Sequence, residues 1–310
     1  MCFLLQIAAV YSFSMQNLYQ QTINKSCSFE GSALHSGEYS GITLHPAPAN
    51  TGIKFKRVDS KLPANQIIID ASFKNIKSSQ LCTTIENDYG LCVSTIEHLM
   101  AALHAYGVDN LLIDINSSEM PILDGSALLF VNEIEKVGIV EQNADREYFE
   151  FTENQPFEDL EKGIEILAIP YDDFRVTVMV DYDSIALGTQ HATMYHLGEF
   201  KEQISPCRTF VFLRELEGLA KAGLIKGGDI DNAIVLVERE EVAQEELDNL
   251  AKLLGKEHLD IQIKGNTLNN CELKFINEPA RHKLLDIIGD LALVGKPIKG
   301  HILATRPGHS

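Results

Sequence analysis

The order of the expected secondary-structure elements is the feature that most restricts the fold of this chain. In the first half, strand patterns and amphipathic helices are expected over residues 42–45, 53–56, 94–106, 110–115 and 126–137. In the second half they are expected near residues 147–153, 163–170, 174–182, 198–204, 239–254, 278–294 and 298–305. Both halves therefore contain strands followed by helices, which predicts an α+β fold.

A polar stretch over residues 142–147 follows the expected helix stop at Gly138. Polar stretches with few apolar side chains are typical of the boundary between two domains. We therefore predict a first α+β domain over residues 15–143 and a second over residues 144–310, although the residues of the two halves show no convincing repeat.

The charge balance excludes one broad class of function. The chain has 26 basic and 44 acidic residues, which gives a net charge of −18. A general nucleic-acid-binding protein needs a positive surface to displace counterions, so no nucleic-acid partner is expected.

The six cysteines are scattered and form no C-x-x-C motif, which favours reduced thiols and a cytoplasmic protein.

The N-terminal segment over residues 2–14 is apolar, but no basic residue precedes Lys25. It therefore lacks the positive region of a signal peptide, and it is too short to span a bilayer. We interpret residues 1–14 as an N-terminal extension, with Met15 as an alternative start. No other run reaches the length of a transmembrane helix, so no membrane span is expected.

The long helix near the C-terminus carries the sharpest candidate site. His282, Asp286 and Asp290 are spaced four residues apart and form one stripe, with the two carboxylates at the edge of the apolar face. An unpaired carboxylate in such a setting costs free energy, because its charge is removed from water. A metal ion held by a His and an Asp one turn apart would offset that cost. The alternative is a His–Asp hydrogen bond on a polar face.

A catalytic zinc needs three protein ligands and an open position for water. His98 is the best third ligand, because Glu97 beside it could deprotonate that water. The alternative is that Glu97 completes a capping box with Ser94 at the start of its helix. His104 lies six residues beyond His98, so it is not on the face of the helix that carries His98. It is expected to be a structural residue.

Two further residues are candidates for catalysis. His309 follows Pro-Gly, so it could point from a turn into a cleft as a general acid, or be only an exposed terminal residue. Thr209 could donate its hydroxyl to an oxyanion, or merely cap a turn. The apolar stretch over residues 210–225 fits either the core or the wall of an acyl passage.

The sequence contains no Walker A, G-x-G-x-x-G, H-E-x-x-H or G-x-S-x-G motif, which removes the commonest nucleotide-binding, dinucleotide-binding, zinc-protease and serine-hydrolase interpretations.

Taken in order, these segments resemble the family of UDP-3-O-acyl-N-acetylglucosamine deacetylases, zinc amidases of bacterial lipid A synthesis. The matching runs are GSALHSG at 31–37, HPAPANTG at 45–52, LCT at 81–83, STIEHL at 94–99, PILDGS at 121–126, RTF at 208–210, RHKLLDIIGDL at 281–291 and GH at 308–309. One run would be a weak signal, but so many in the correct order over roughly residues 15–310 are a strong one.

The resemblance implies two similar domains, each with helices layered on a sheet, and an active site between them. It implies that Zn²⁺, or alternatively Fe²⁺, is held by His98, His282 and Asp286. Glu97 would be the general base, and Thr209 would hold the oxyanion. His309, oriented by Asp290, would stabilise charge or protonate the leaving amine. The reaction implied is removal of the N-acetyl group of UDP-3-O-acyl-N-acetylglucosamine, the committed step of lipid A synthesis.

The resemblance also implies how the UDP-linked, acylated amino sugar is bound. Lys283 would meet the diphosphate, and Tyr182 would pack on the nucleotide. Phe210 and Leu81 lie in matching runs and are further candidates for substrate contact. An insert near residues 209–237 would form the acyl passage, and a monomer is expected.

Two features depart from the family pattern. Residues 1–14 have no counterpart, and the sequence stops one residue after His309, where the family continues. Some members are fused to a dehydratase of fatty-acid synthesis, so a cut from a longer chain is one interpretation. Two other functions remain open, namely a zinc amidase for another acetylated substrate and a non-catalytic protein that binds a UDP-sugar or an acyl chain.

Overall fold

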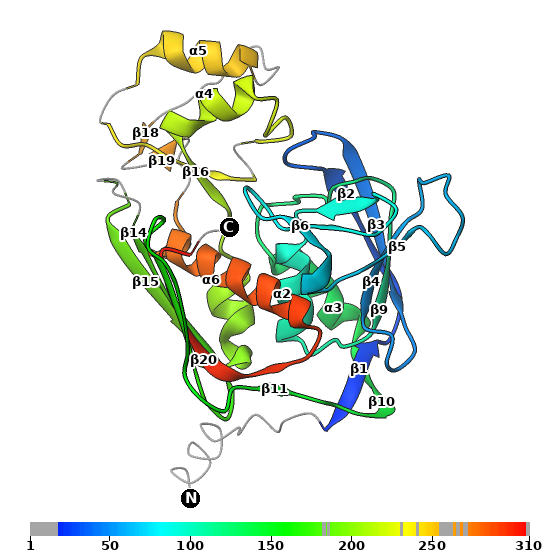
Figure 1. The fold of residues 1–310 in the computed structure, drawn as a ribbon. Coiled ribbons are helices and arrows are strands. Elements are labelled where there is room, and N and C mark those ends of the chain that lie inside the picture. The colour runs from blue at the N-terminus through cyan, green and yellow to red at the C-terminus, as the bar shows by residue number, and fades with distance from the viewer. Residues whose placement is uncertain are drawn as a thin grey trace, which may run out of the picture.

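The computed structural model of the chain describes residues 18–181, 184, 187–229, 232–239, 242–253, 263–264, 267–268 and 272–307. Two large β-sheets lie on either side of a central pair of helices, α2 and α6 (Figure 1). Helix α2 spans Glu97–Ala105 and α6 spans Glu278–Leu291. This mixed arrangement of sheets and helices agrees with the predicted α+β class.

The first large sheet has the strand order β2-β3-β9-β4-β5. Its strands are β2 (Cys27–Ser32), β3 (Tyr39–Pro46), β4 (Ile53–Arg57), β5 (Ile68–Asp70) and β9 (Leu111–Ile115). The expected strands at 42–45 and 53–56 are confirmed, but β9 lies between them, antiparallel to β3 and parallel to β4. The turn that joins β3 to β4 therefore does not make a hairpin.

A small antiparallel sheet leads into α2. It consists of β6 (Ile76–Ser78), β7 (Thr84–Glu86) and β8 (Cys92–Ser94), with a 3₁₀ turn at Phe73–Asn75 before it. The alternative of a capping box for Glu97 is wrong: Ser94 ends β8 and donates its hydroxyl to the carbonyl of Ser118. Helix α2 begins after Ile96 without a side-chain cap, so the Glu97 carboxylate has another role.

The expected boundary between residues 143 and 144 falls within a strand. Helix α3 (Leu128–Val137) ends at Gly138, whose φ of 80° suits a residue without a side chain. Strand β10 (Ile139–Asp145) follows at once and pairs with β1 (Tyr19–Ile23). Residues 142–145 of the polar stretch therefore belong to a strand and not to a linker. The division into two domains stays a prediction.

The second large sheet has the order β12-β13-β20-β14-β15, with β11 also paired to β20. Its strands are β11 (Phe149–Glu150), β12 (Gln155–Asp159), β13 (Ile164–Ile169), β14 (Phe174–Asp181), β15 (Thr189–Met194) and β20 (Ile298–Thr305). In β14 and β20 every second residue is buried, as expected for strands with one face on the core. Helix α6 covers that face (Figure 1).

A 3₁₀ turn (Leu197–Glu199) and a short π-helix (Phe200–Ile204) follow β15 and pack against the main body, beside α6. The next part of the chain, before α6, forms a smaller unit at one end of the molecule (Figure 1). The unit itself contains β16 (Phe210–Phe212), α4 (Leu213–Lys221), β17 (Ile234–Leu236), α5 (Gln244–Leu253), β18 (Ile263–Lys264) and β19 (Thr267–Leu268). The expected insert near residues 209–237 lies here, with a small hydrophobic cluster of its own around Leu213, Leu216, Ile225 and Val237.

The main hydrophobic core extends across both halves of the chain. Phe55 of β4, Leu99 of α2, Val176 of β14 and Leu284 of α6 are all fully buried in the same cluster. Burial of apolar side chains is the dominant stabilising term in folding, so the two halves are stabilised together. Among the described residues, no helix is both long enough and apolar enough to cross a membrane.

Candidate metal centre

Three potential metal ligands converge where α2 packs against α6. His98 is the second residue of α2, and His282 and Asp286 lie one turn apart on α6. The Oδ1 atom of Asp286 is 3.3 Å from Nε2 of His282 and 3.8 Å from Nε2 of His98. All three side chains are buried, and one ligand atom from each lies within 4.8 Å of the others. The structure thus brings together the three residues that the sequence predicted.

The tautomer of His282 is set by the backbone. Its Nδ1 atom lies 3.0 Å from the carbonyl oxygen of Cys207, and a carbonyl can only accept, so Nδ1 carries the proton. The Nε2 atom then presents a lone pair towards Asp286. A ligating His usually donates its other ring nitrogen in this way, and two imidazoles with a carboxylate suit Zn²⁺ or Fe²⁺. The donor set therefore fits a divalent transition metal.

Glu97 lies at the first position of α2, directly before His98, and is buried. Its Oε2 atom accepts a hydrogen bond of 3.1 Å from the backbone N–H of Thr83. The hydroxyl of Thr83 donates to Oδ1 of Asp290. Thr83 thus connects the predicted general base to the predicted partner of His309. Thr83 lies in the LCT run, but nothing in the sequence pattern indicates this role.

Gly289 allows the two helices that carry the site to approach closely. A Cβ built on this residue would lie 2.1 Å from the carbonyl oxygen of Glu97 and 2.9 Å from its Cα. Real Cβ atoms do not come so near to backbone atoms, because dense packing leaves no room for overlap. The glycine therefore keeps His98 of α2 within reach of Asp286 on α6.

Thr209 is held in place by two hydrogen bonds of its backbone. Its N–H donates to the carbonyl of Gly125 at 2.8 Å, and its carbonyl accepts from the N–H of Ile234 at 2.8 Å. It follows Cys207, whose carbonyl contacts His282, by two residues. The segment that carries Thr209 is therefore attached to the helix that carries two of the metal ligands.

The comparisons with known proteins show which family the chain belongs to. A family model described as LpxC: UDP-3-O-acyl N-acetylglycosamine deacetylase matches residues 20–252 and 249–310. The chain belongs to this deacetylase family.

Several curated relatives support the assignment. The chain is 47% identical over 293 residues to the bifunctional enzyme LpxC/FabZ of Bacteroides thetaiotaomicron. The aligned residues make up 94% of this chain and 62% of the relative. It is 36% identical over 296 residues to the UDP-3-O-acyl-N-acetylglucosamine deacetylase of Neisseria meningitidis, with 94% and 87% covered. The deacetylase of Idiomarina loihiensis is 35% identical over 294 residues, with 94% and 86% covered. The chain thus spans less than two thirds of the bifunctional relatives.

Among the substrate contacts expected for a member of the family, Lys283 and Phe210 lie together beside the metal ligands. The Nζ atom of Lys283 is 3.0 Å from Oδ2 of Asp286 and 5.7 Å from the centre of the Phe210 ring. Leu81 lies two residues before Thr83 and is 43% exposed, which is high for an apolar side chain. Contact of these three residues with a substrate stays a prediction.

Two predicted site residues, Tyr182 and His309, lie outside the residues that the structure describes. Asp290, the expected partner of His309, is described, and it accepts the hydrogen bond from Thr83. The roles assigned to Tyr182 and His309 stay predictions.

Two cysteine thiols lie in the segments that support the centre. Burial raises the pKa of Cys82 to about 11, with a further contribution from the charge of Glu97. Burial and the charge of Glu278 raise the pKa of Cys207 to about 12. Both thiols are therefore protonated near neutral pH. Cys207 contributes its carbonyl oxygen instead.

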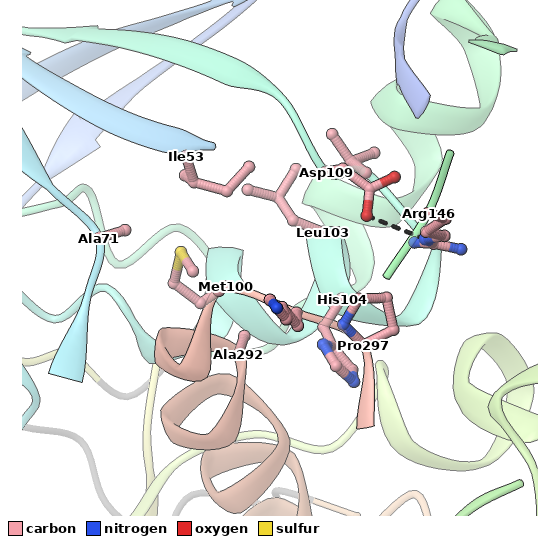
Figure 2. A pocket seen from close by; sticks show the side chains of 12 residues that line it. Ile53, Ala71, Met100, Leu103, His104, Asp109, Arg146, Ala292 and Pro297 are labelled. Carbon is pink, nitrogen blue, oxygen red and sulfur yellow. Dashed lines mark hydrogen bonds and ion pairs between the residues drawn. The ribbon is translucent and has the colours of Figure 1, made fainter. Parts of the chain in front are cut away.

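A separate pocket lies beside the C-terminal half of α2, and none of the metal ligands lines it (Figure 2). Its lining includes His104 and the ion pair of Asp109 with Arg146, whose Oδ1 and Nε atoms are 2.9 Å apart. The ring of His104 packs edge-on against Phe174, with the ring centres 5.0 Å apart. Burial, aided by the charge of Arg146, lowers the pKa of His104 to about 4. His104 is thus a neutral packing residue, as the sequence predicted.

Proposed function

We propose that the chain is a zinc-dependent deacetylase that hydrolyses the N-acetyl group of UDP-3-O-acyl-N-acetylglucosamine in lipid A synthesis. The products would be UDP-3-O-acyl-glucosamine and acetate. The observation that carries the proposal is the buried group of His98, His282 and Asp286, with a buried glutamate, Glu97, directly before His98 in α2. The names of the relatives from Neisseria and Idiomarina supply the substrate.

The chemistry of the donor set supports zinc. Catalytic zinc sites use three protein ligands from His and carboxylate residues and keep one position open. When bound, zinc lowers the pKa of the water it coordinates to about 7 and polarises a carbonyl group. Iron has similar ligand preferences and remains the alternative metal.

Each protein residue has a distinct part in the proposed reaction. Glu97 takes the proton of the attacking water, and the N–H of Thr83 fixes the orientation of its carboxylate. Thr209 donates its hydroxyl to the oxygen that becomes negative as the acetamide carbon turns tetrahedral. The C–N bond then breaks, and His309, with Asp290, supplies the proton that the leaving amine needs. Lys283 attracts the diphosphate.

The experiment is to measure acetate release from UDP-3-O-acyl-N-acetylglucosamine by the zinc-loaded chain and by its Glu97→Gln variant. Glutamine keeps the shape and can accept the hydrogen bond from Thr83, but it cannot take a proton. We expect the parent to release acetate and the variant to be slower by about 10²-fold or more, the scale of general-base catalysis, at unchanged zinc content. A parent chain that holds zinc but releases no acetate would contradict the proposal.

A second assay separates this reaction from that of a zinc amidase with another substrate. N-acetylglucosamine without UDP and the acyl chain should react far more slowly, because binding energy from remote groups contributes to the rate. Equal values of kcat/KM for the two substrates would favour the alternative amidase.

A further inference from the structure

Glu278, the first residue of α6, has a completely buried carboxylate that the proposed reaction does not use. Its Oε1 atom accepts from the backbone N–H and from Nε of Arg208, both at 3.0 Å. Its Oε2 atom accepts from Nη2 of Arg208 at 3.2 Å and from the backbone N–H of Lys274 at 2.6 Å. Each carboxylate oxygen thus accepts two hydrogen bonds, and the Arg208 guanidinium donates to both oxygens.

An ion pair with a fully buried carboxylate is a costly way to stabilise a fold. Removing a charge from water is unfavourable, and the attraction to its partner often only offsets that loss. Such a pair is well suited to holding a geometry, because the planar guanidinium fork fits a carboxylate in one orientation. A positional role therefore explains the pair better than stability alone.

The pair holds the segment that contacts the metal ligand. Arg208 lies between Cys207, whose carbonyl accepts from Nδ1 of His282, and Thr209. Glu278 precedes His282 by four residues, so both project from the same face of α6 towards this segment. The carboxylate of Glu278 and the imidazole of His282 therefore contact adjacent residues, Arg208 and Cys207.

We infer that Glu278 and Arg208 are positioning residues for the metal centre. By fixing the backbone at Arg208, the pair holds the Cys207 carbonyl where it selects the tautomer and ring orientation of His282. It also sets the position of Thr209 relative to the same helix, so that the oxyanion donor and the metal ligand form one rigid unit. The inference rests on the metal centre of the proposed function and not on its substrate.

The test is the affinity for zinc of the Glu278→Gln variant of the full chain, measured by competition with a chromophoric chelator. A glutamine would turn one of the two acceptor atoms into a donor facing the donors of Arg208 and Lys274. We expect the zinc dissociation constant to rise by about 10-fold or more, the scale seen when an outer partner of a ligating His is lost. The visible spectrum of the Co²⁺-loaded variant should change as well, because it reports the ligand geometry.

The matched control is Asp109→Asn, which disrupts another partly buried ion pair, that of Asp109 with Arg146 (Figure 2). This variant should unfold at a lower urea concentration but keep the zinc affinity and the Co²⁺ spectrum of the parent. An equal loss of zinc affinity in both variants would overturn the inference, because it would mean general destabilisation. Unchanged zinc affinity in Glu278→Gln would overturn it too.

A second variant covers the case in which Glu278→Gln does not fold. Arg208→Lys keeps the positive charge but loses the two-pronged contact, so it should fold and still bind zinc more weakly than the parent. Parent-like zinc affinity in a folded Arg208→Lys would overturn the inference. Acetate release by the parent is measured separately: a parent that binds zinc but releases no acetate contradicts the proposed substrate and leaves the positioning result intact.

Discussion

Gly289 of α6 lies against the backbone of Glu97 so closely that a Cβ on the glycine would be 2.1 Å from the Glu97 carbonyl oxygen. We expect Gly289→Ala to force α2 and α6 apart, which would lower the free energy of unfolding by about 1–3 kcal/mol, as overpacking does. Zinc affinity should fall as well, because His98 and Asp286 lie on different helices. Urea unfolding and chelator competition measure the two effects.

Gly218 of α4 provides the control for this substitution. It is also helical, but a Cβ built on it would meet nothing within 4 Å. Gly218→Ala should therefore leave zinc affinity unchanged and raise stability by up to about 1 kcal/mol through helix propensity. If both alanine variants behave like the parent, the close approach of the helices does not hold the site together.

Thr83 should matter through its hydroxyl group. Thr83→Val keeps the shape and the backbone N–H that binds Glu97 but removes the hydroxyl that donates to Asp290. Because a hydrogen bond to a charged group contributes about 1.5–3 kcal/mol, we expect kcat for acetate release to fall about 10-fold or more. Thr83→Ser retains the donor and should stay close to the parent. Equal rates for the valine and serine variants would exclude this role.

Removing the metal should destabilise the fold. A ligand that binds only the native state stabilises it by about 2.7 kcal/mol at a hundred times its dissociation constant. A chelator should therefore lower the Tm of the parent, and Zn²⁺ but not Mg²⁺ should restore it, since Mg²⁺ prefers oxygen ligands. In Asp286→Asn the effect of the chelator should be much smaller. Recovery of the Tm with Mg²⁺ would argue against a site of two imidazoles and one carboxylate.

His104 makes stability depend on pH. Its pKa falls from 6.5 to about 4 on folding, so between these values the unfolded chain binds a proton that the native protein does not. Stability is therefore full above pH 6.5 and decreases as the pH falls towards 4, by roughly 2 kcal/mol at pH 5. Urea unfolding at pH 7.5 and pH 5 measures this difference.

The control for this titration is His104→Asn, which cannot take up a proton in this range. Other groups also titrate between pH 5 and 7.5, so the relevant quantity is the difference between the parent and the variant. The variant should lose about 2 kcal/mol less than the parent over that interval. An identical loss in both proteins would mean that His104 is not the responsible group.

The candidate site was predictable where it follows helical periodicity. His282 and Asp286 face the same side because residues four apart lie on one face of a helix, and that rule needs no tertiary structure. His98 and Glu97 were selected by their chemistry and by the order of the family motifs. Local pattern could not decide whether Glu97 caps its helix, because the capping box and a catalytic base look identical in the sequence. The structure decided it, because Ser94 belongs to β8 and its hydroxyl bonds to Ser118, while the Glu97 carboxylate accepts from Thr83, fourteen residues earlier.

The strands were predictable in part. The pattern of residues 298–305 gave the bounds of β20, but β12 and β15 were not expected. All five residues of β12 lack the alternation of buried and exposed side chains, because this strand lies at the edge of its sheet. The insertion of β9 between β3 and β4 was equally hidden, since strand pairing joins distant segments.

The sequence alone determined the fold class, the family and the identity of the proposed metal ligands, because periodicity and motif order are local properties. Only the tertiary structure decided how those ligands are supported. The contact of Gly289 with Glu97, the pairing of Arg208 with Glu278 and the hydrogen bond from His282 to Cys207 each join residues that are 70 or more positions apart. Such contacts depend on how the helices pack against each other, and packing is a property of the whole core.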